Sequence, residues 1–379
     1  MEDSPKEKSS PKSKQESKEH SKADAKKLAK EAFEQRSKRS SDAIYYWIVI
    51  GGFIVMCLGC VFYVFREWRD SPNLVSAVNV NEIDRHNKVS GVSFTRGSNS
   101  MFAGRSLEDV KNLFQSYLSD DFKELYFCPS KEDKTAIVPE AYNFREIHKE
   151  CAAPVMYQGA CSSAYALTLA SMVSDRLCLS TGKRNPISPQ HVISCDVDIN
   201  EGCKKGYVQR AYDFHSRNGF YNETCMPYAL GAFVNCSQKC NTTMEEGRRA
   251  SKICGIDLQE QIKREIVLNG PVVAALEVHS DFLTYKSGIY SADFAKYVYA
   301  GGHVVKVIGW GEELGRKYWI IENTWGEDWG EKGTGRIEIQ GKDDLHISQI
   351  ALAVVVEGKK EEKKPKGGET AEKNQTTTT

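Results

Sequence analysis

Three separate segments of this 379-residue chain carry side chains that nucleophilic acyl-transfer chemistry uses. Such chemistry needs a nucleophile, an imidazole that takes its proton, a group that orients the imidazole, and donors for the developing oxyanion. Residues 158–166 read QGACSSAYA, residues 301–311 read GGHVVKVIGWG, and residues 323–330 read NTWGEDWG. Together they supply a thiol, an imidazole and two side-chain amides, and they form the candidate site of the chain.

These segments resemble the motifs of papain-like cysteine proteases, most closely those of cathepsin B and cathepsin C. The family reads QGxCGSCWA in the first segment and NSWGxxWG in the third, and cathepsin B reads GGHAIRILGWG in the second. The resemblance implies that His303 is the proton acceptor, that Asn323 orients its ring, and that Gln158 is the oxyanion donor.

The resemblance also implies three supporting residues. Trp325 would cover the His303–Asn323 hydrogen bond, and Trp329 belongs to the same motif. Gly206 would pair through its backbone with an extended substrate.

The position of the attacking cysteine holds Ala164. A methyl group has no lone pair and no proton to lose, so it cannot attack a carbonyl carbon. Other positions also depart from the family pattern: Ser162 replaces a glycine, Tyr165 replaces a tryptophan, and Lys204–Lys205 replace Asn-Gly. Cys161 is a poor substitute nucleophile, because the resemblance pairs it with Cys203 in a disulfide that would consume its thiolate.

Three functions follow from this pattern. The first is an inactive homologue, a pseudoprotease, that holds a peptide or protein partner in its cleft, such as an inhibitor or an active protease. The second is an active cathepsin B-like endopeptidase in which Ala164 is an engineered or erroneous replacement of cysteine. The further changes at Ser162 and Tyr165 favour the first, because a single knock-out would leave the neighbours alone. The third is a scaffold whose cleft is blocked by residues 92–118.

The cysteines after residue 65 fit an oxidising compartment. By family match the expected pairs are Cys161–Cys203, Cys151–Cys178, Cys195–Cys236 and Cys225–Cys240. Cys128 and Cys254 remain, and they either pair with each other or stay free.

Residues 43–65 are 23 residues without a charge, long enough as a helix to span a bilayer core of about 30 Å. Basic residues are concentrated before this span, at Arg36, Lys38 and Arg39, which predicts a cytosolic N-terminus and a type II signal anchor. The C-terminal part is then lumenal or extracellular. Three glycosylation sequons agree with that side, at Asn222, Asn235 and Asn241.

The chain divides into five expected parts. Residues 1–42 form a disordered, charged cytosolic tail, 43–65 the transmembrane helix, 66–137 a propeptide-like or stalk segment, 138–357 the papain-like domain, and 358–379 a disordered tail. The resemblance implies an α+β fold of two lobes, a helical one and a β-barrel-like one. Family propeptides normally run backwards through the cleft.

Local patterns place the elements that must position the site. A helix is expected over 165–177, a second over 107–118 with Ser106 as its N-cap, and strands over 304–310, 318–322 and 335–339. Zero net charge indicates no particular partner, and we expect no nucleic-acid binding, no cofactor and no metal site.

Overall fold

The computed structural model describes residues 26–27, 30–31, 34–36, 38, 45–63, 77–119, 121, 126–128, 137–232, 234–237, 240, 249–293, 296–339 and 345–357. The chain divides into two compact units, residues 1–73 and residues 74–379. The expected C-terminal tail lies outside the described residues.

The first unit contains an apolar helix, Tyr45–Tyr63, and none of its 19 residues is buried. At about 1.5 Å per residue it is about 28 Å long, so its length and composition suit a membrane span. The described residues between 26 and 38 are also helical, although the sequence predicts a disordered tail there. These described residues are lysine, glutamate, glutamine and arginine, which are strong helix formers.

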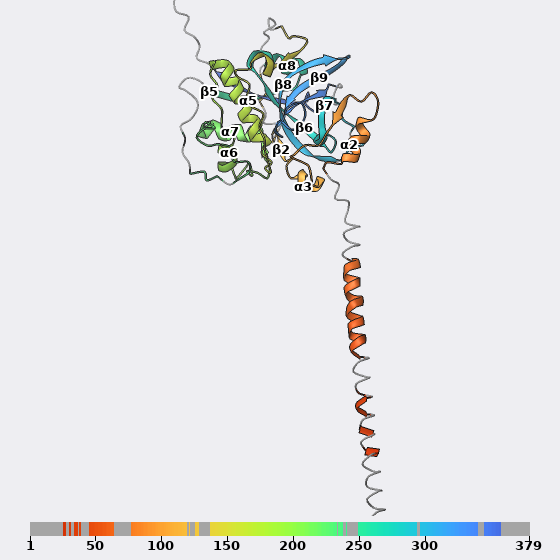
Figure 1. Cartoon of the computed structure of the whole chain (residues 1–379). Coiled ribbons are helices and arrows are strands. Elements are labelled where there is room, and N and C mark those ends of the chain that lie inside the picture. The colour runs from red at the N-terminus through yellow and green to blue at the C-terminus, as the bar shows by residue number, and fades with distance from the viewer. Residues whose placement is uncertain are drawn as a thin grey trace, which may run out of the picture. The chain divides into compact units, whose positions relative to one another are not determined.

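The second unit holds all the remaining elements (Figure 1). Its helices are α2 (Val80–Asn87), α3 (Leu107–Lys111), α4 (Phe144–Ile147), α5 (Ala164–Thr181), α6 (Gln190–Cys195), α7 (Val208–Asn218) and α8 (Gln259–Asn269), with a 3₁₀ turn η2 (Phe282–Thr284). Its strands are β1 (Phe94–Arg96), β2 (Ser116–Tyr117), β3 (Tyr142–Asn143), β4 (Gly206–Tyr207), β5 (Arg249–Ile256), β6 (Val272–His279), β7 (Tyr285–Tyr290), β8 (Tyr299–Glu313), β9 (Arg316–Glu322), β10 (Thr334–Glu338) and β11 (Ala351–Glu357).

One large sheet runs in the order β1-β7-β10-β9-β8-β6-β11-β5, and β3 pairs with β8 off this path. Most neighbours are antiparallel, while β7 and β10 are parallel. The predicted strands are present as parts of β8, β9 and β10, and the predicted helix over 165–177 is the middle of α5. Gly182 ends α5 in a left-handed conformation (φ 67°), which glycine adopts without steric strain.

Two apolar cores correspond to two lobes. One core is built from α5, α6 and α7 with one face of β6, β8 and β11. The other lies around Trp310, Trp319 and Trp329 and takes in β7, β9 and β10 together with further residues of β6, β8 and β11. Figure 1 shows α5, α6 and α7 together on one side of the unit and β7, β8 and β9 on the other. The fold is therefore α+β with two lobes, as expected.

The segment before the papain-like domain belongs to the same compact unit. Phe94, Met101, Phe102 and Phe114 are buried in the strand-rich core. The described part of the 66–137 segment is thus not a stalk that stands apart from the domain but a packed layer of the unit, because its aromatic side chains complete the core.

The helix predicted over 107–118 is wrong in its second half. Ser106 and Asp109 form the expected capping box, but α3 ends at Lys111. The next residues are extended: Ser116–Tyr117 forms β2, which pairs with β4. Backbone pairing with a distant strand replaces the helical hydrogen bonds in this stretch.

Candidate active site

The strand pairing of β8 with β9 brings His303 and Asn323 together. Lys306 lies opposite Glu322 in this antiparallel ladder, which brings Asn323, directly after β9, close to His303 on β8. The His303 Nε2 atom lies 2.8 Å from Asn323 Oδ1, and both side chains are buried.

The hydrogen bonds around Asn323 define the imidazole tautomer. Asn323 Oδ1 accepts from the Thr324 backbone N–H at 2.8 Å, so His303 Nε2 must be the donor to the same oxygen. His303 Nδ1 then carries the lone pair, and it has no hydrogen-bond partner among the described residues. Burial lowers the pKa of His303 to about 4, although the bond to Asn323 partly offsets this, so the ring is neutral at pH 7.

Aromatic side chains enclose this pair. The Trp325 ring lies 4.9 Å from the His303 ring, and Trp329 packs edge-on against Trp325 at 5.2 Å. Phe114, from the segment before the domain, approaches both His303 at 6.0 Å and Trp325 at 5.5 Å. The rings exclude water from the His303–Asn323 bond, which strengthens it.

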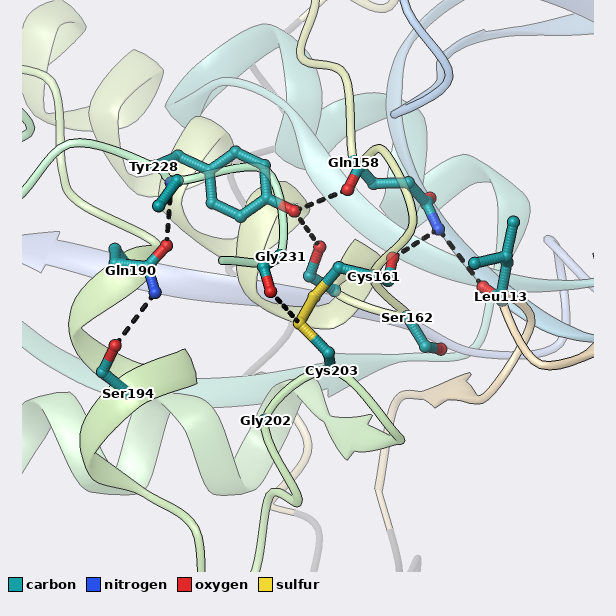
Figure 2. The surroundings of a disulfide bond; sticks show 12 residues. Leu113, Gln158, Cys161, Ser162, Gln190, Ser194, Gly202, Cys203, Tyr228 and Gly231 are labelled. Carbon is teal, nitrogen blue, oxygen red and sulfur yellow. Dashed lines mark hydrogen bonds between the residues drawn. A yellow bond between two sulfur atoms is a disulfide. The ribbon is translucent and has the colours of Figure 1, made fainter. Parts of the chain in front are cut away.

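Gln158 is fully buried and is held from both ends of its amide. Thr324 Oγ1 donates to Gln158 Oε1 at 2.7 Å, which places Gln158 beside the His303–Asn323 pair. Gln158 Nε2 donates to the carbonyl oxygens of Cys161 at 2.9 Å and Leu113 at 3.2 Å. Figure 2 shows this amide between the two carbonyls. The group expected to donate to an oxyanion thus donates to a backbone carbonyl of the chain itself.

Ala164 is the first residue of α5 and is fully buried. Cys161, three residues earlier, has its sulfur in a disulfide with Cys203 (Figure 2). The described part of the site therefore holds no free thiol: the free cysteines are Cys57 and Cys60, in the apolar helix.

Residues 113–118 lie between the two lobes, where the family resemblance implies a cleft. On the helical side, Gly206 N–H donates to Gln115 O at 3.0 Å and β2 runs parallel to β4. On the strand-rich side, Gln115 forms a parallel bridge with Gly302. Residues 113–118 are called the cleft segment below.

Glycine makes the close approach of the cleft segment possible. A Cβ atom on Gly301 would lie 2.5 Å from the Phe114 carbonyl oxygen, and one on Gly302 would lie 2.8 Å from the Tyr117 ring. Gly206 is equally tight, because a Cβ there would lie 2.4 Å from the Tyr165 ring. Side chains at these positions would push the segment or its supports away.

Two of the positions that depart from the family pattern contact this region. Ser162 Oγ accepts from the Gln115 backbone N–H at 3.0 Å, and Tyr165 donates from its hydroxyl to the Gly202 carbonyl at 3.0 Å. Lys205 forms a salt bridge with Glu201 at 2.9 Å, and Lys204 is exposed. The structure therefore favours a solvated loop for the lysine pair, whereas Ser162 binds the cleft segment directly.

A buried ionic cluster lies behind the site and joins the lobes. Lys306 Nζ on β8 lies 2.6 Å from Asp175 on α5 and 2.8 Å from Glu322 on β9. Arg145 adds a second cation at 2.5 Å from Glu322. Burial opposes the charge on Lys306, but the two carboxylates raise its pKa, so the ammonium persists.

The disulfides are Cys128–Cys254, Cys151–Cys178, Cys161–Cys203, Cys195–Cys236 and Cys225–Cys240. Four of these pairs are the ones that the resemblance implies, and Cys128 pairs with Cys254. Asn235 is exposed, while the half-buried Asn222 donates its amide to Asn185; Asn241 lies outside the described residues.

Comparison with known proteins assigns the family. The profile described as "Papain family cysteine protease" matches residues 138–355. The chain belongs to the papain family of cysteine proteases. Among papain-family relatives, it is 35% identical over 226 residues to "Cathepsin B-like CP2" of Giardia intestinalis, covering 57% of this chain and 74% of that protein.

Two further matches of this papain-family member extend beyond the papain-like domain. It is 29% identical to "Tubulointerstitial nephritis antigen-like" of Homo sapiens over 81% of this chain and 73% of that protein. The solved structure "proCathepsin B S9 from Trypanosoma congolense" superposes with a TM-score of 0.65 at 27% identity, covering 75% of this chain and 99% of that one. This share exceeds what residues 138–357 alone supply, so part of the preceding segment is included.

Sequence reasoning missed Leu113 and Phe114 as site residues. The pattern around them predicts helix, and only their contacts with Gln158, His303 and Trp325 reveal their position. The propeptide-like character of the segment was the available signal, because it implies a chain in the cleft.

Proposed function

We propose that this papain-family, cathepsin B-like protein is a pseudoprotease that binds without cutting. The observation that carries the proposal is the buried His303–Asn323 pair. The Nδ1 atom of His303 has no hydrogen-bond partner among the described residues, and position 164 holds alanine. A neutral imidazole with a bare nitrogen is what remains when a thiol donor is absent, and leaving a buried acceptor unpaired costs about 1–3 kcal/mol.

The expected loss of activity is large. Removal of the nucleophile from a serine protease reduces kcat by about 10⁶, and the same argument applies to a thiolate. Gln158 would still offer an amide donor, but its Nε2 bonds to Leu113 in the resting structure. Similarity to a relative named as an antigen, and not as a protease, is consistent with a binding role.

The proposed location is a membrane surface. The five disulfides of the papain-like unit suit a secretory or lysosomal lumen. The helix Tyr45–Tyr63 would act as a type II signal anchor, with the basic tail in the cytosol. The partner would be a peptide or protein, such as a protease or an inhibitor, held in the cleft after the cleft segment leaves or on the outer surface while it stays.

A turnover assay tests the absence of catalysis. The purified chain is compared with Ala164→Cys and with Ala164→Ser on a set of fluorogenic peptides, before and after the N-terminal segment is released by an added protease together with a reductant, since Cys128–Cys254 links the segment to the domain. We expect no turnover by the unaltered chain and thiol-inhibitor-sensitive turnover by Ala164→Cys after removal. Robust turnover by the unaltered chain, blocked by a thiol reagent, would refute the proposal.

A scaffold with an unused cleft is the second candidate, and one observation favours it. The cleft segment pairs through its backbone with both Gly206 and Gly302, which lie on opposite sides of it. Binding of a library of extended peptides distinguishes the two: a pseudoprotease that uses its cleft binds some of them competitively with the cleft segment, whereas a scaffold binds none.

A further inference from the structure

The Cys128–Cys254 disulfide joins the segment that precedes the papain-like domain to the domain itself. Cys128 follows the cleft segment and precedes Val138, where the match to the family begins. Cys254 is fully buried in β5, well inside the papain-like domain. The other four disulfides all join residues within 151–240, so Cys128–Cys254 is the sole covalent link, apart from the backbone, between the segment and the domain.

Backbone hydrogen bonds next to the disulfide also join residues 126–128 to β5. Cys128 N–H donates to Gly255 O at 2.9 Å, and Gly255 N–H donates to Tyr126 O at 2.8 Å, so residues 126–128 add a short parallel bridge to the edge of β5. The Lys252 ammonium lies 4.4 Å from the Tyr126 ring. The attachment is thus a built contact and not an isolated bond.

The same segment is anchored at its other end in the cleft. Ser162 accepts from Gln115, Gly206 donates to Gln115, and Gln209 donates to Leu118. Phe102 and Phe114 are fully buried against Trp325. The cleft segment therefore has a specific site on the domain, and Cys128 lies ten residues beyond its end.

We infer that the Cys128–Cys254 disulfide makes the cleft segment a permanent occupant, so that cleavage of the backbone between residues 129 and 137 opens neither the cleft nor the link to the N-terminal part. The product is two chains joined by one disulfide. A tether of this kind keeps the segment at a local concentration in the mM range, about 10³ above a µM sample, so rebinding outcompetes escape. The inference goes beyond the proposed function and does not depend on whether the domain cuts peptides. It places a bound partner on the outer surface as long as the disulfide is intact, and in the cleft only after the backbone is cut and the disulfide is reduced.

The consequence concerns what cleavage can achieve. In a protein whose segment has no such disulfide, one cut frees the segment to dissociate. Here dissociation needs both the cut and reduction of the disulfide, in which a dithiol donates two electrons and two protons and leaves as its own disulfide while Cys128 and Cys254 become thiols. If residues 45–63 anchor the chain, the domain also stays on the membrane after the cut.

The test cuts the full chain at a defined place. A recognition sequence for a sequence-specific protease is inserted between Ser130 and Lys131, and the purified chain in detergent is cut to completion. We expect one band on a non-reducing gel and two after reduction. The variant Cys128→Ser/Cys254→Ala should give two bands on both the non-reducing and the reducing gel. The matched control Cys225→Ser/Cys240→Ser lacks a disulfide that lies wholly C-terminal to the cut, and it should behave as the parent does.

Hydrogen exchange reports whether the cleft stays filled. The amides of Gln115 and Ser116 should exchange at the same rate, within about twofold, in the uncut and the cut parent. After cutting, the Cys128→Ser/Cys254→Ala variant diluted to nM concentration should exchange about 100-fold faster or more. Fast exchange in the cut parent with its disulfide intact, or separation of its fragments without reductant, would overturn the inference. The uncut-against-cut comparison within the parent decides the question even if the double variant does not fold.

These outcomes are distinct from failure of the proposed function. Turnover by the unaltered chain would refute the pseudoprotease and leave the exchange result standing. Loss of amide protection on cutting would refute the permanent occupant and leave the absence of turnover standing.

Discussion

At the scale of single residues, the site contains an imidazole, His303, and the amide that orients it, Asn323, while position 164 holds alanine. Asn323 fixes the His303 ring with Nε2 as donor, and the remaining nitrogen is buried without a partner among the described residues. No charged group is among the causes that shift the pKa of His303, which is lowered to about 4 by burial and partly offset by Asn323. Burial therefore keeps the ring neutral at pH 7.

Restoring a thiol at position 164 should reverse that pKa shift. In Ala164→Cys the new thiolate would stabilise the imidazolium, and an opposite charge within about 4–6 Å raises the pKa of a histidine by about 1 to 3. An NMR titration of the His303 ring measures this. Ala164→Ser is the control, because a hydroxyl of similar size stays neutral and should leave the pKa near 4. An unchanged pKa in Ala164→Cys would mean that side chain 164 does not face the imidazole.

At the scale of elements, Phe114 is a buried anchor of the cleft segment. Its ring is fully buried and packs against Phe102, His303 and Trp325. Phe114→Ala removes these contacts and leaves a cavity, which costs about 3–5 kcal/mol for a buried phenylalanine. Urea unfolding measures the loss.

Ile137→Ala is the matched control for that measurement. Ile137 lies in the same region of the chain but is 86% exposed, so its removal should change the free energy of unfolding by less than about 0.5 kcal/mol. Equal effects of the two substitutions would contradict the packing of Phe114 in the cleft.

The same segment separates what the sequence could predict from what it could not. Ser106 and Asp109 announce the start of α3 because a capping box is a local pattern. The end of α3 is not determined locally: the extended conformation of residues 115–117 depends on Gly206 and Gly302, which lie far away in the chain. The pairing of Cys128 with Cys254 is similar, since it depends on how the segment lies against β5. The candidate site residues were found through the family motifs, whose chemistry is recognisable without a structure.

At the scale of the whole molecule, the two lobes are joined by polar contacts as well as by apolar cores. Lys306 links α5 to β9 through Asp175 and Glu322, directly behind the catalytic-like pair. A buried cation between two carboxylates fixes the relative position of the elements that meet there, and removal of one partner typically costs about 3–5 kcal/mol. The same joint would hold the cleft at a constant width whether it cuts or only binds.

Two buried groups, His215 and Asp281, should contribute to the pH dependence of the stability with opposite signs, beside other buried groups such as His303. Burial lowers the pKa of His215 to about 3, below its ordinary 6.5, so between these values the unfolded state holds a proton that the folded state lacks, and stability rises with pH. Burial raises the pKa of Asp281 to about 6, above its ordinary 3.8, so there the folded state holds the extra proton and stability falls as pH rises.

Substitution of each group isolates its contribution. Between pH 4 and 6, His215→Phe should reduce the slope of the unfolding free energy against pH by up to about 1.4 kcal/mol per pH unit, and Asp281→Asn should increase it by a similar amount. Phenylalanine suits position 215, because the histidine ring already stacks on Phe220 at 4.5 Å. Urea unfolding at several pH values gives both slopes. If both substitutions changed the slope in the same direction, the opposite titrations would be contradicted. A general loss of stability is distinguishable, because it lowers the unfolding free energy at every pH without changing the slope.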